Sequence, residues 1–343
     1  MKLMKTEEAV GQVLCHDITQ IIKGVTKDAV FRKGHVIRHE DIPVLLSVGK
    51  DHIYIWENDE NMLHENEGAQ ILFDICKNDF MHGSEVKEGK IELIADCDGL
   101  LKVDKEKIKA INSLGQMMIA SRHGNFPVKK GDKIAGTRII PLVIEKEKME
   151  EAKLVARGGQ IFQIKPFNHK KVGIVTTGNE VFYHRIEDTF TPVIQEKLSE
   201  YDTEIIGHKY SSDDVDLEIK CIQELLAAGA DMIICTGGMS VDPDDKTPLA
   251  IKTAADSVVS YGAPVLPGAM FMLAYKNREE GGKIPLVGLP GCVMYASRTI
   301  FDLILPRLFA DDFVLKEEIE ALGEGGLCLN CKTCTFPNCG FGK

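Results

Sequence analysis

The stretch DMIICTGGMSVDPDD, residues 231–245, joins a short apolar run to a glycine-bearing turn that is rich in aspartate. Two further stretches have the same form, KVGIVTTGNE at residues 171–180 and KIPLVGLPG at residues 283–291. Short buried strands that lead through glycine turns into helices are typical of βα units in a parallel or mostly parallel sheet. The sequence therefore predicts an α/β fold for this half of the chain.

The turns of such a sheet are the expected place for a ligand. They follow the carboxyl ends of the strands, where ligands bind. Glycine lets backbone N–H groups approach a phosphate closely, and the helix N-terminus that follows favours negative charge. Glu180 lies in the first turn, and Asp242, Asp244 and Asp245 lie in the second. Phosphate-binding turns beside carboxylates predict a phosphorylated ligand bridged by a divalent metal.

Length and composition narrow the class of protein. A chain of 343 residues is long enough for two or three domains, and 44% apolar with 27% charged residues is typical of a soluble globular protein. No apolar stretch reaches the length of a membrane span, and the first residues lack the apolar core of a signal peptide. The net charge of −11 argues against a nucleic-acid partner. We therefore expect a cytoplasmic protein with no membrane partner.

The order of patterns predicts four parts. We expect an N-terminal α/β module at residues 1–66, a β-rich accessory module at 67–160, a three-layer α/β/α domain at 165–310 and a tail at 311–343. Residues 59–66 are polar and predict a loop. Helices are predicted over residues 105–114, with Asp104 as N-cap, and over residues 146–157.

Two helices are predicted in the third part. The first follows SSDD, with Ser212 as its N-cap and Gly229 at its end. The second runs from residue 291 to residue 309. The side chains expected on their buried faces are Val215, Ile219, Ile222 and Leu226 in the first helix, and Ile300, Ile304 and Leu308 in the second.

Cysteine usage divides into two groups. Six of the ten cysteines are scattered, mostly in apolar runs, and are expected to be buried small hydrophobic residues. The other four, Cys328, Cys331, Cys334 and Cys339, crowd into CLNCKTCTFPNC near the C-terminus. This spacing is close to the bacterial ferredoxin run, and four thiolates could equally hold structural zinc. A disordered tail with incidental thiols is the alternative. We expect a metal-binding appendage whose removal leaves ligand binding by the main domain intact.

Residues 165–310 resemble the molybdopterin-binding fold shared by molybdopterin molybdenumtransferases (MoeA and gephyrin E type) and molybdopterin adenylyltransferases (MogA type). The resemblance is carried by TTGNE at 176–180, TGG at 236–238 with acidic residues after it, LPG at 266–268 and GLPG at 288–291. The order and spacing of four motifs makes it specific. Residues 1–150, with VGQVLCHDI near the start and GDKIAG at 131–136, look like the accessory domains of the transferases.

The resemblance implies an enzyme of molybdenum cofactor biosynthesis, which inserts molybdate into adenylylated molybdopterin and releases AMP. It also implies Mg²⁺ and a homodimer that shares its site between subunits. Adenylylation of molybdopterin and a non-catalytic molybdopterin-binding or carrier role are the alternatives. The chain departs from the transferases in its loop DPDDKTP, in PGAMFM at 267–272, and in a cysteine tail where they have a C-terminal β domain.

The resemblance also assigns roles to residues. Glu180 and Asp245 would hold Mg²⁺, and Lys246 would offset developing phosphate charge. A solvated helix-capping carboxylate is the alternative for Glu180, and a surface lysine for Lys246. The residues expected to contact molybdopterin or its phosphate are Thr177, Gly178, Asn179, Thr236, Gly237, Gly238, Ser240, Asp242, Pro290 and Gly291.

Overall fold

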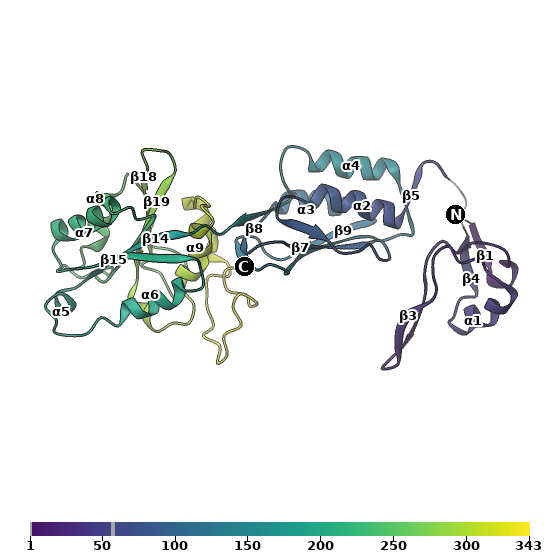
Figure 1. Cartoon of the computed structure of the whole chain (residues 1–343), viewed down its shortest axis with the longest axis horizontal. Coiled ribbons are helices and arrows are strands. Elements are labelled where there is room, and N and C mark those ends of the chain that lie inside the picture. The colour runs from purple at the N-terminus through teal and green to yellow at the C-terminus, as the bar shows by residue number, and fades with distance from the viewer. Residues whose placement is uncertain (1, 56–58) are drawn as a thin grey trace. The chain divides into compact units, whose positions relative to one another are not determined.

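The computed structural model describes residues 2–55 and 59–343 and divides the chain into two compact units. The first unit comprises Met1–Asp96, Asp104–Arg122 and Gly131–Gln163, and the second comprises Cys97–Val103, His123–Lys130 and Ile164–Lys343. Figure 1 shows strands and helices in both units. Within the described residues, no helix is long and apolar enough to cross a membrane.

The first unit begins with two small antiparallel pairings, β1 with β4 and β2 with β3. Leu14, Ile37, Leu45 and Ile53 are buried in one apolar cluster at its centre. The elements of this part are β1 Lys2–Lys5, η1 Thr6–Glu8, β2 Ile18–Ile22, β3 Thr26–Phe31, η2 His39–Asp41, α1 Ile42–Ser47 and β4 His52–Ile55.

The rest of the first unit is a four-stranded antiparallel sheet, in the order β6-β7-β11-β9, with α2, α3 and α4 on one face (Figure 1). The Asp104 side chain accepts a hydrogen bond from the Lys107 backbone N–H at 3.0 Å, so the predicted N-cap of α3 is confirmed. The elements are β5 Met62–His64, α2 Glu65–Cys76, β6 Met81–Gly83, β7 Lys90–Ala95, α3 Lys105–Ser113, β9 Met117–Ser121, β11 Lys133–Ile139, β12 Val143–Glu145 and α4 Lys146–Ala156.

The predicted loop at residues 59–66 is wrong, because it contains β5 and the start of α2. Helix α2 begins after His64, whose ring accepts from the Asn66 backbone N–H at 3.1 Å. Histidine is an unusual N-cap, so the common start signal is missing. Gly68 weakens the helical pattern further, but a Cβ there would lie 3.0 Å from Ile144 Cγ2, so close packing explains the glycine.

The second unit is built on a six-stranded sheet in the order β15-β14-β16-β19-β18-β17. Strands β15, β14, β16 and β19 are parallel, and β18 and β17 continue the sheet in antiparallel pairings. The elements of the sheet and its helices are β14 Lys170–Thr177, α5 Asn179–Phe182, α6 Phe190–Leu198, β15 Thr203–Ser211, α7 Val215–Ala227, β16 Met232–Thr236, α8 Thr247–Ala254, β17 Ser257–Tyr261, β18 Met272–Asn277, β19 Lys283–Leu289, η3 Gly291–Met294 and α9 Ile300–Phe309. The remaining elements are β8 Gly99–Val103, β10 Phe126–Val128, β13 Phe162–Pro166, α10 Lys316–Glu320 and η4 Ala321–Gly323.

The alternation of side chains along the strands makes two apolar faces. Ile174 and Ile234 pack in one core cluster with residues of α6 and α9. Val175 and Ile233 point to the other face, where they pack with residues of α7 and α8. Figure 1 shows α7 and α8 on one side of β14 and β15, with α6 on the other. The predicted three-layer α/β/α domain is confirmed.

Helix α7 differs from its prediction in two respects. Its N-cap is Asp214, which accepts from the Leu217 backbone N–H at 2.9 Å, and not Ser212. The fully buried positions of the helix are Glu218, Cys221, Ile222 and Leu225, whereas the predicted Val215, Ile219 and Leu226 are not fully buried. The buried stripe is therefore shifted around the helix, and it includes a carboxylate.

The predicted helix over residues 291–309 is two elements, η3 and α9. Thr299 begins α9 by accepting from the Phe301 backbone N–H at 3.2 Å, and Asp302 completes a capping box with the Thr299 N–H. The new helix start at Thr299 therefore divides the predicted helix in two. Ile300, Ile304 and Leu308 are buried as predicted.

Candidate functional site

The parallel pairing brings the predicted turns to one edge of the sheet. Thr176 pairs with Thr236, and Thr236 pairs with Leu289. Thr177, the last residue of β14, pairs with Ser211, the last residue of β15. The segments that follow these four strands therefore start side by side at their carboxyl ends.

The first two turns are joined by hydroxyl hydrogen bonds. Buried Thr177 donates from Oγ1 to the Thr236 carbonyl oxygen at 3.1 Å, and its Oγ1 lies 3.0 Å from Thr247 Oγ1. Gly237 has φ +82°, and a Cβ there would lie 2.2 Å from the Thr177 carbonyl oxygen. Gly238 has φ +55°, and its Cβ would lie 2.7 Å from Thr247 Oγ1. Both glycines are required by the close approach of the two turns.

Glu180 is exposed in the first turn of α5. Its carboxylate folds back over Gly178, which has φ +131°, so that a Cβ at Gly178 would lie 2.9 Å from Glu180 Oε1. The backbone N–H of half-buried Asn179 donates to Asp213 Oδ2 at 3.2 Å. The first turn thus carries two carboxylates, one from its own sequence and one from the segment after β15.

Asp213 is a site residue that the sequence analysis missed. Burial raises the pKa of its carboxyl, and repulsion from Glu180, Asp244 and Asp245 raises it further. This repulsion places the three other carboxylates within electrostatic reach of Asp213. Strand β15 is an edge strand of mostly half-buried and exposed residues, so it gave no apolar run, and the SSDD that follows it was interpreted only as a helix start.

The second turn is a short loop held by its own aspartates. Asp245 Oδ2 accepts from the Asp242 backbone N–H at 3.1 Å, and the Asp245 N–H donates to the Asp242 carbonyl oxygen at 2.9 Å. The carbonyl oxygen of exposed Ser240 accepts from the Tyr261 hydroxyl at 3.3 Å. Asp242 is exposed, whereas Asp245 and Lys246 are half-buried at the start of α8. The loop therefore holds the Asp245 side chain by a hydrogen bond and leaves the Asp242 side chain exposed.

Glu218 lies beneath these turns, on the buried face of α7, with 1% of its surface exposed. Burial raises the pKa of its carboxyl to about 7, although a hydrogen bond with Thr247 opposes the shift. Asp213 and Asp214 raise the pKa further, and Lys246 lowers it. Its Oε2 atom has no hydrogen-bond partner among the described residues. Glu218, whose carboxyl binds a proton near neutral pH, therefore contacts Thr247, which in turn contacts Thr177.

The third turn joins the same edge with fewer constraints. Pro290 is buried and directly follows Leu289, the strand partner of Thr236. Gly291 is exposed, and a Cβ there would have nothing within 4 Å. The structure places both residues at the edge but shows no close approach that requires glycine at position 291.

The carboxylates at this edge suit a hard cation. Within the described part of the chain, no three His, Cys, Asp or Glu side chains converge to form a metal shell by themselves. Mg²⁺ usually takes only one or two protein carboxylates and completes its shell with phosphate oxygens and water. The repulsion that Glu180 and Asp245 exert on Asp213 is the feature that a cation would relieve.

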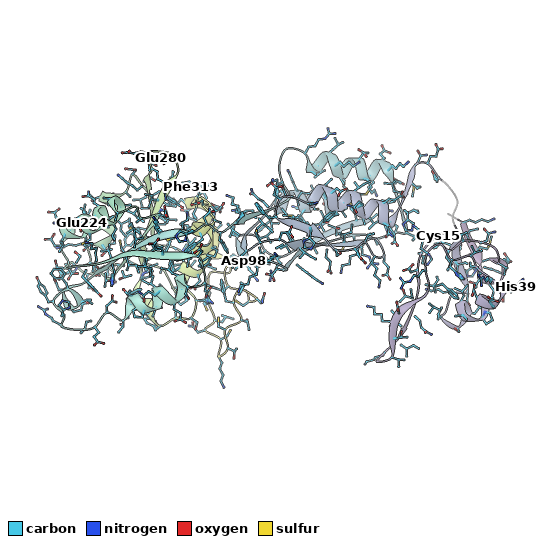
Figure 2. The ribbon with its side chains drawn as sticks, in the orientation of Figure 1. Cys15, His39, Asp98, Glu224, Glu280 and Phe313 are labelled. Carbon is cyan, nitrogen blue, oxygen red and sulfur yellow. The ribbon has the colours of Figure 1, made fainter. Side chains whose placement is uncertain are left out.

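A large cavity of the second unit, about 730 Å³, lies elsewhere. Lys170, Asp231 and Lys283 line it from the amino ends of the strands. Phe313, which is labelled in Figure 2, also lines it. Two ion pairs of its lining are Arg278 with Asp231, at 2.6 Å, and Lys170 with Asp311. We place the candidate site at the carboxyl edge, because the unbalanced carboxylates and the glycine turns lie there.

Solved structures similar to this chain align with part of it. MoaB of Thermus thermophilus, a molybdopterin biosynthesis enzyme, is 21% identical, covers 43% of this chain and 98% of its own, and has a TM-score of 0.36. The tungsten cofactor synthesizing protein MoaB of Pyrococcus furiosus is 21% identical, with 41% and 94% covered and a TM-score of 0.35. The molybdopterin biosynthesis Mog protein of Mycobacterium ulcerans is 17% identical, with 40% and 94% covered and a TM-score of 0.33.

Two family models match separate parts of the chain. Residues 3–57 match a domain of unknown function, DUF8806. Residues 173–310 match a family described as a probable molybdopterin binding domain. No curated protein matches the chain. The second match covers the sheet, its helices and all three turns. Residues 173–310 therefore form a domain of the molybdenum cofactor biosynthesis type.

Proposed function

We propose that this domain inserts molybdate into adenylylated molybdopterin and releases AMP. The observation that carries the proposal is the contact between the first two glycine turns at the carboxyl edge of the sheet, through Thr177, Thr236 and Thr247. Glu180, Asp213 and Asp245 lie in the segments that begin at this edge. A ligand with a phosphoanhydride suits this edge, because glycine turns admit phosphate oxygens and the carboxylates suit the cation that accompanies them.

Each turn has a separate task in this proposal. The backbone N–H groups of Gly237 and Gly238 bind phosphate oxygens, and Thr177 keeps the first two turns at a fixed separation through its contacts with Thr236 and Thr247. The pterin lies along the same edge towards Pro290 and Gly291. Catalysis is then mainly a matter of orientation, because the phosphoanhydride bond must be held rigidly as it breaks.

The charged residues act on the anhydride. Asp245 and Glu180 would hold Mg²⁺, which supplies charge neutralisation at the phosphate oxygens when it is bound. Asp213 holds the Asn179 N–H and so fixes the turn that carries Glu180. Lys246, half-buried at the start of α8, offsets the negative charge that AMP carries as it leaves.

An assay of the purified full chain tests the proposal. The reaction contains Mg²⁺, adenylylated molybdopterin and either molybdate or tungstate, and AMP is measured by chromatography. We expect AMP release that depends on the oxyanion, and its loss in Asp245→Asn. The matched control is Asp216→Asn, which removes an exposed carboxylate from α7.

Two outcomes would replace the proposal. Formation of adenylylated molybdopterin from ATP and molybdopterin, without oxyanion-dependent AMP release, would indicate an adenylyltransferase. Tight binding of molybdopterin with no turnover of either substrate would indicate a binding or carrier protein. Mass spectrometry of the pterin product distinguishes the first outcome, and calorimetry distinguishes the second.

A further inference from the structure

The last segment of the chain, residues 325–343, folds back on itself and onto the second unit; we call it the cysteine loop. Its two ends meet where the Gly342 N–H donates to the Gly325 carbonyl oxygen at 2.9 Å. The Leu266 N–H donates to the Gly326 carbonyl oxygen, and the Cys328 N–H donates to that of Leu266, both at 2.8 Å. The loop is thus closed at its base and pinned to the LPG motif.

Aromatic side chains anchor the loop in the core. Phe341 is 4% exposed and belongs to the same apolar cluster as the residues of α9. Phe336 packs against that cluster and lies under the guanidinium of Arg298, 5.0 Å from ring centroid to Cζ. The loop is drawn in yellow beside α9 in Figure 1. These contacts fix the segment that carries the cysteines.

All four cysteines of the loop line one cavity of about 490 Å³. Cys331 and Cys334 are exposed, and Cys328 and Cys339 are half-buried against the core. None of the cysteines in the described residues is in a disulfide. The thiols do not yet converge: within the described residues no three metal-binding side chains form a shell. The cavity between them is the space into which they can close.

Packing alone does not explain this group. A cysteine that acts as a small hydrophobic residue is normally buried, whereas two of these four are exposed. Spacings of two, two and four residues along one short loop allow all four thiolates to reach a common centre. Thiolates are soft ligands and select zinc or iron–sulfur clusters. Metal binding also commonly completes the folding of such a segment, so four thiols that line one cavity can close around a metal.

The cavity borders the connection that follows the third turn. Pro267 of the LPG motif lines it, as do residues 295–298, which connect η3 to α9 after the third turn. Within that connection Tyr295 is 81% exposed, so its side chain has little to hold it in place. If the cysteine loop closes around a metal, it becomes rigid and packs against residues 295–298.

We propose that the four thiolates of the cysteine loop bind one metal centre, and that this centre holds residues 295–298 in place beside the third turn. The chemistry required is that of a soft metal with four sulfur ligands. An iron–sulfur cluster and a zinc ion both satisfy it, and they are distinguished by acid-labile sulfide and visible absorption. The proposal does not depend on the reaction at the carboxyl edge.

The first test measures metal in the full chain, purified anaerobically and then incubated either with Fe²⁺ and sulfide or with Zn²⁺. We expect one centre per chain in one of the two arms, and at least a tenfold loss of retained metal in Cys331→Ser and in Cys334→Ser. These two side chains are exposed, so neither substitution disturbs the core. Cys97→Ser, outside the cavity, is the control and should retain the metal. No retained metal in either arm, with all four thiols open to titration, overturns the proposal.

The second test concerns residues 295–298 and uses no pterin ligand. Hydrogen–deuterium exchange is compared between the metal-loaded and metal-free full chain. We expect slower exchange in residues 295–298 and 325–343 of the loaded protein, and unchanged exchange in α7. Slower exchange in the cysteine loop alone would be consistent with a metal centre, but it would contradict the restraint of residues 295–298 by that centre.

Discussion

Asp213 Oδ2 accepts a hydrogen bond from the Asn179 backbone N–H at 3.2 Å, and this contact joins the segment after β15 to the first turn. The two residues follow neighbouring parallel strands, whose last residues, Ser211 and Thr177, are paired. The edge strand β15 therefore also leads into the candidate site, as the three apolar strands do. The Asp213 carboxylate, just after β15, holds the backbone next to Glu180.

Asp213→Asn should lower turnover by roughly 10- to 100-fold, as the loss of a residue that orients a ligand usually does. Asparagine keeps an oxygen that can accept from Asn179, so the fold should survive and the loss should reflect charge. Steady-state AMP release and circular dichroism measure the two quantities. Asp216→Asn is the control, and equal activity in both variants would contradict a role for Asp213.

Asp245→Ala and Glu180→Ala should each abolish turnover without unfolding the domain. Both carboxylates lie at the exposed edge, and neither is in the apolar core. Asp245→Ala also removes the contact with the Asp242 N–H, so some loosening of the loop is expected. Thermal unfolding separates this effect from the loss of activity. Full activity in both variants would mean that the active edge lies elsewhere.

Gly237→Ala should destabilise the protein by roughly 3 kcal/mol or more, because its Cβ would collide with the Thr177 carbonyl oxygen at 2.2 Å. Gly229→Ala is the matched control. It also has positive φ, but nothing lies within 4 Å of the added Cβ, so about 1 kcal/mol is expected. Denaturant unfolding measures both. Similar losses in the two variants would show that backbone conformation, and not the contact between the turns, sets the requirement for glycine.

The sequence predicted the parts of the site that follow apolar strands. Thr177 ends a buried run, Gly237 and Gly238 follow the next one, and the structure brings these positions together. Asp213 and Glu218 could not be found in this way. Asp213 follows a half-exposed edge strand, and Glu218 is a carboxylate on a buried face where an apolar residue is expected. Only the pairing of β15 with β14 and the position of α7 reveal them.

The missed elements have a similar cause. Helix α2 begins at a histidine cap, and the break before α9 depends on Thr299 and Asp302 within a pattern that otherwise continues. Local signals of this kind are weak, and they acquire their effect from tertiary packing. The three-layer arrangement was predictable because it depends on three apolar runs that each lead through a glycine turn towards a helix.

Glu218 should make stability fall as pH rises from about 4.5 to about 7. Its pKa is raised to about 7 in the folded protein from 4.5 in the unfolded chain, so the folded state holds a proton that unfolding releases in this window. The loss amounts to about 3 kcal/mol across the window. Glu218→Gln should remove the slope and stabilise the protein above pH 7.

The control for this experiment is Glu224→Gln, on the exposed side of the same helix (Figure 2). The pKa of Glu224 is lowered by its hydrogen bond with Lys209, so its contribution to the slope lies below the window. Urea unfolding at several pH values measures all three proteins. A slope that persists unchanged in Glu218→Gln would assign the pH dependence to another group.

The cysteine loop should prove to be part of the core and not a detachable appendage. Phe341 is 4% exposed among residues of α9, and a Cβ at Gly342 would lie 2.5 Å from Leu303 Cδ2. Phe341→Ala should therefore cost about 3–5 kcal/mol and lower the Tm, whether or not metal is bound. Leu329→Ala, in the same loop but 77% exposed, should change stability by less than about 0.5 kcal/mol. Because Phe341 belongs to the core, deletion of residues 325–343 should destabilise the whole domain. Loss of ligand binding in the deletion variant would therefore not show that the cysteines contact the ligand. A deletion variant with an unchanged Tm would restore the expectation of an independent tail.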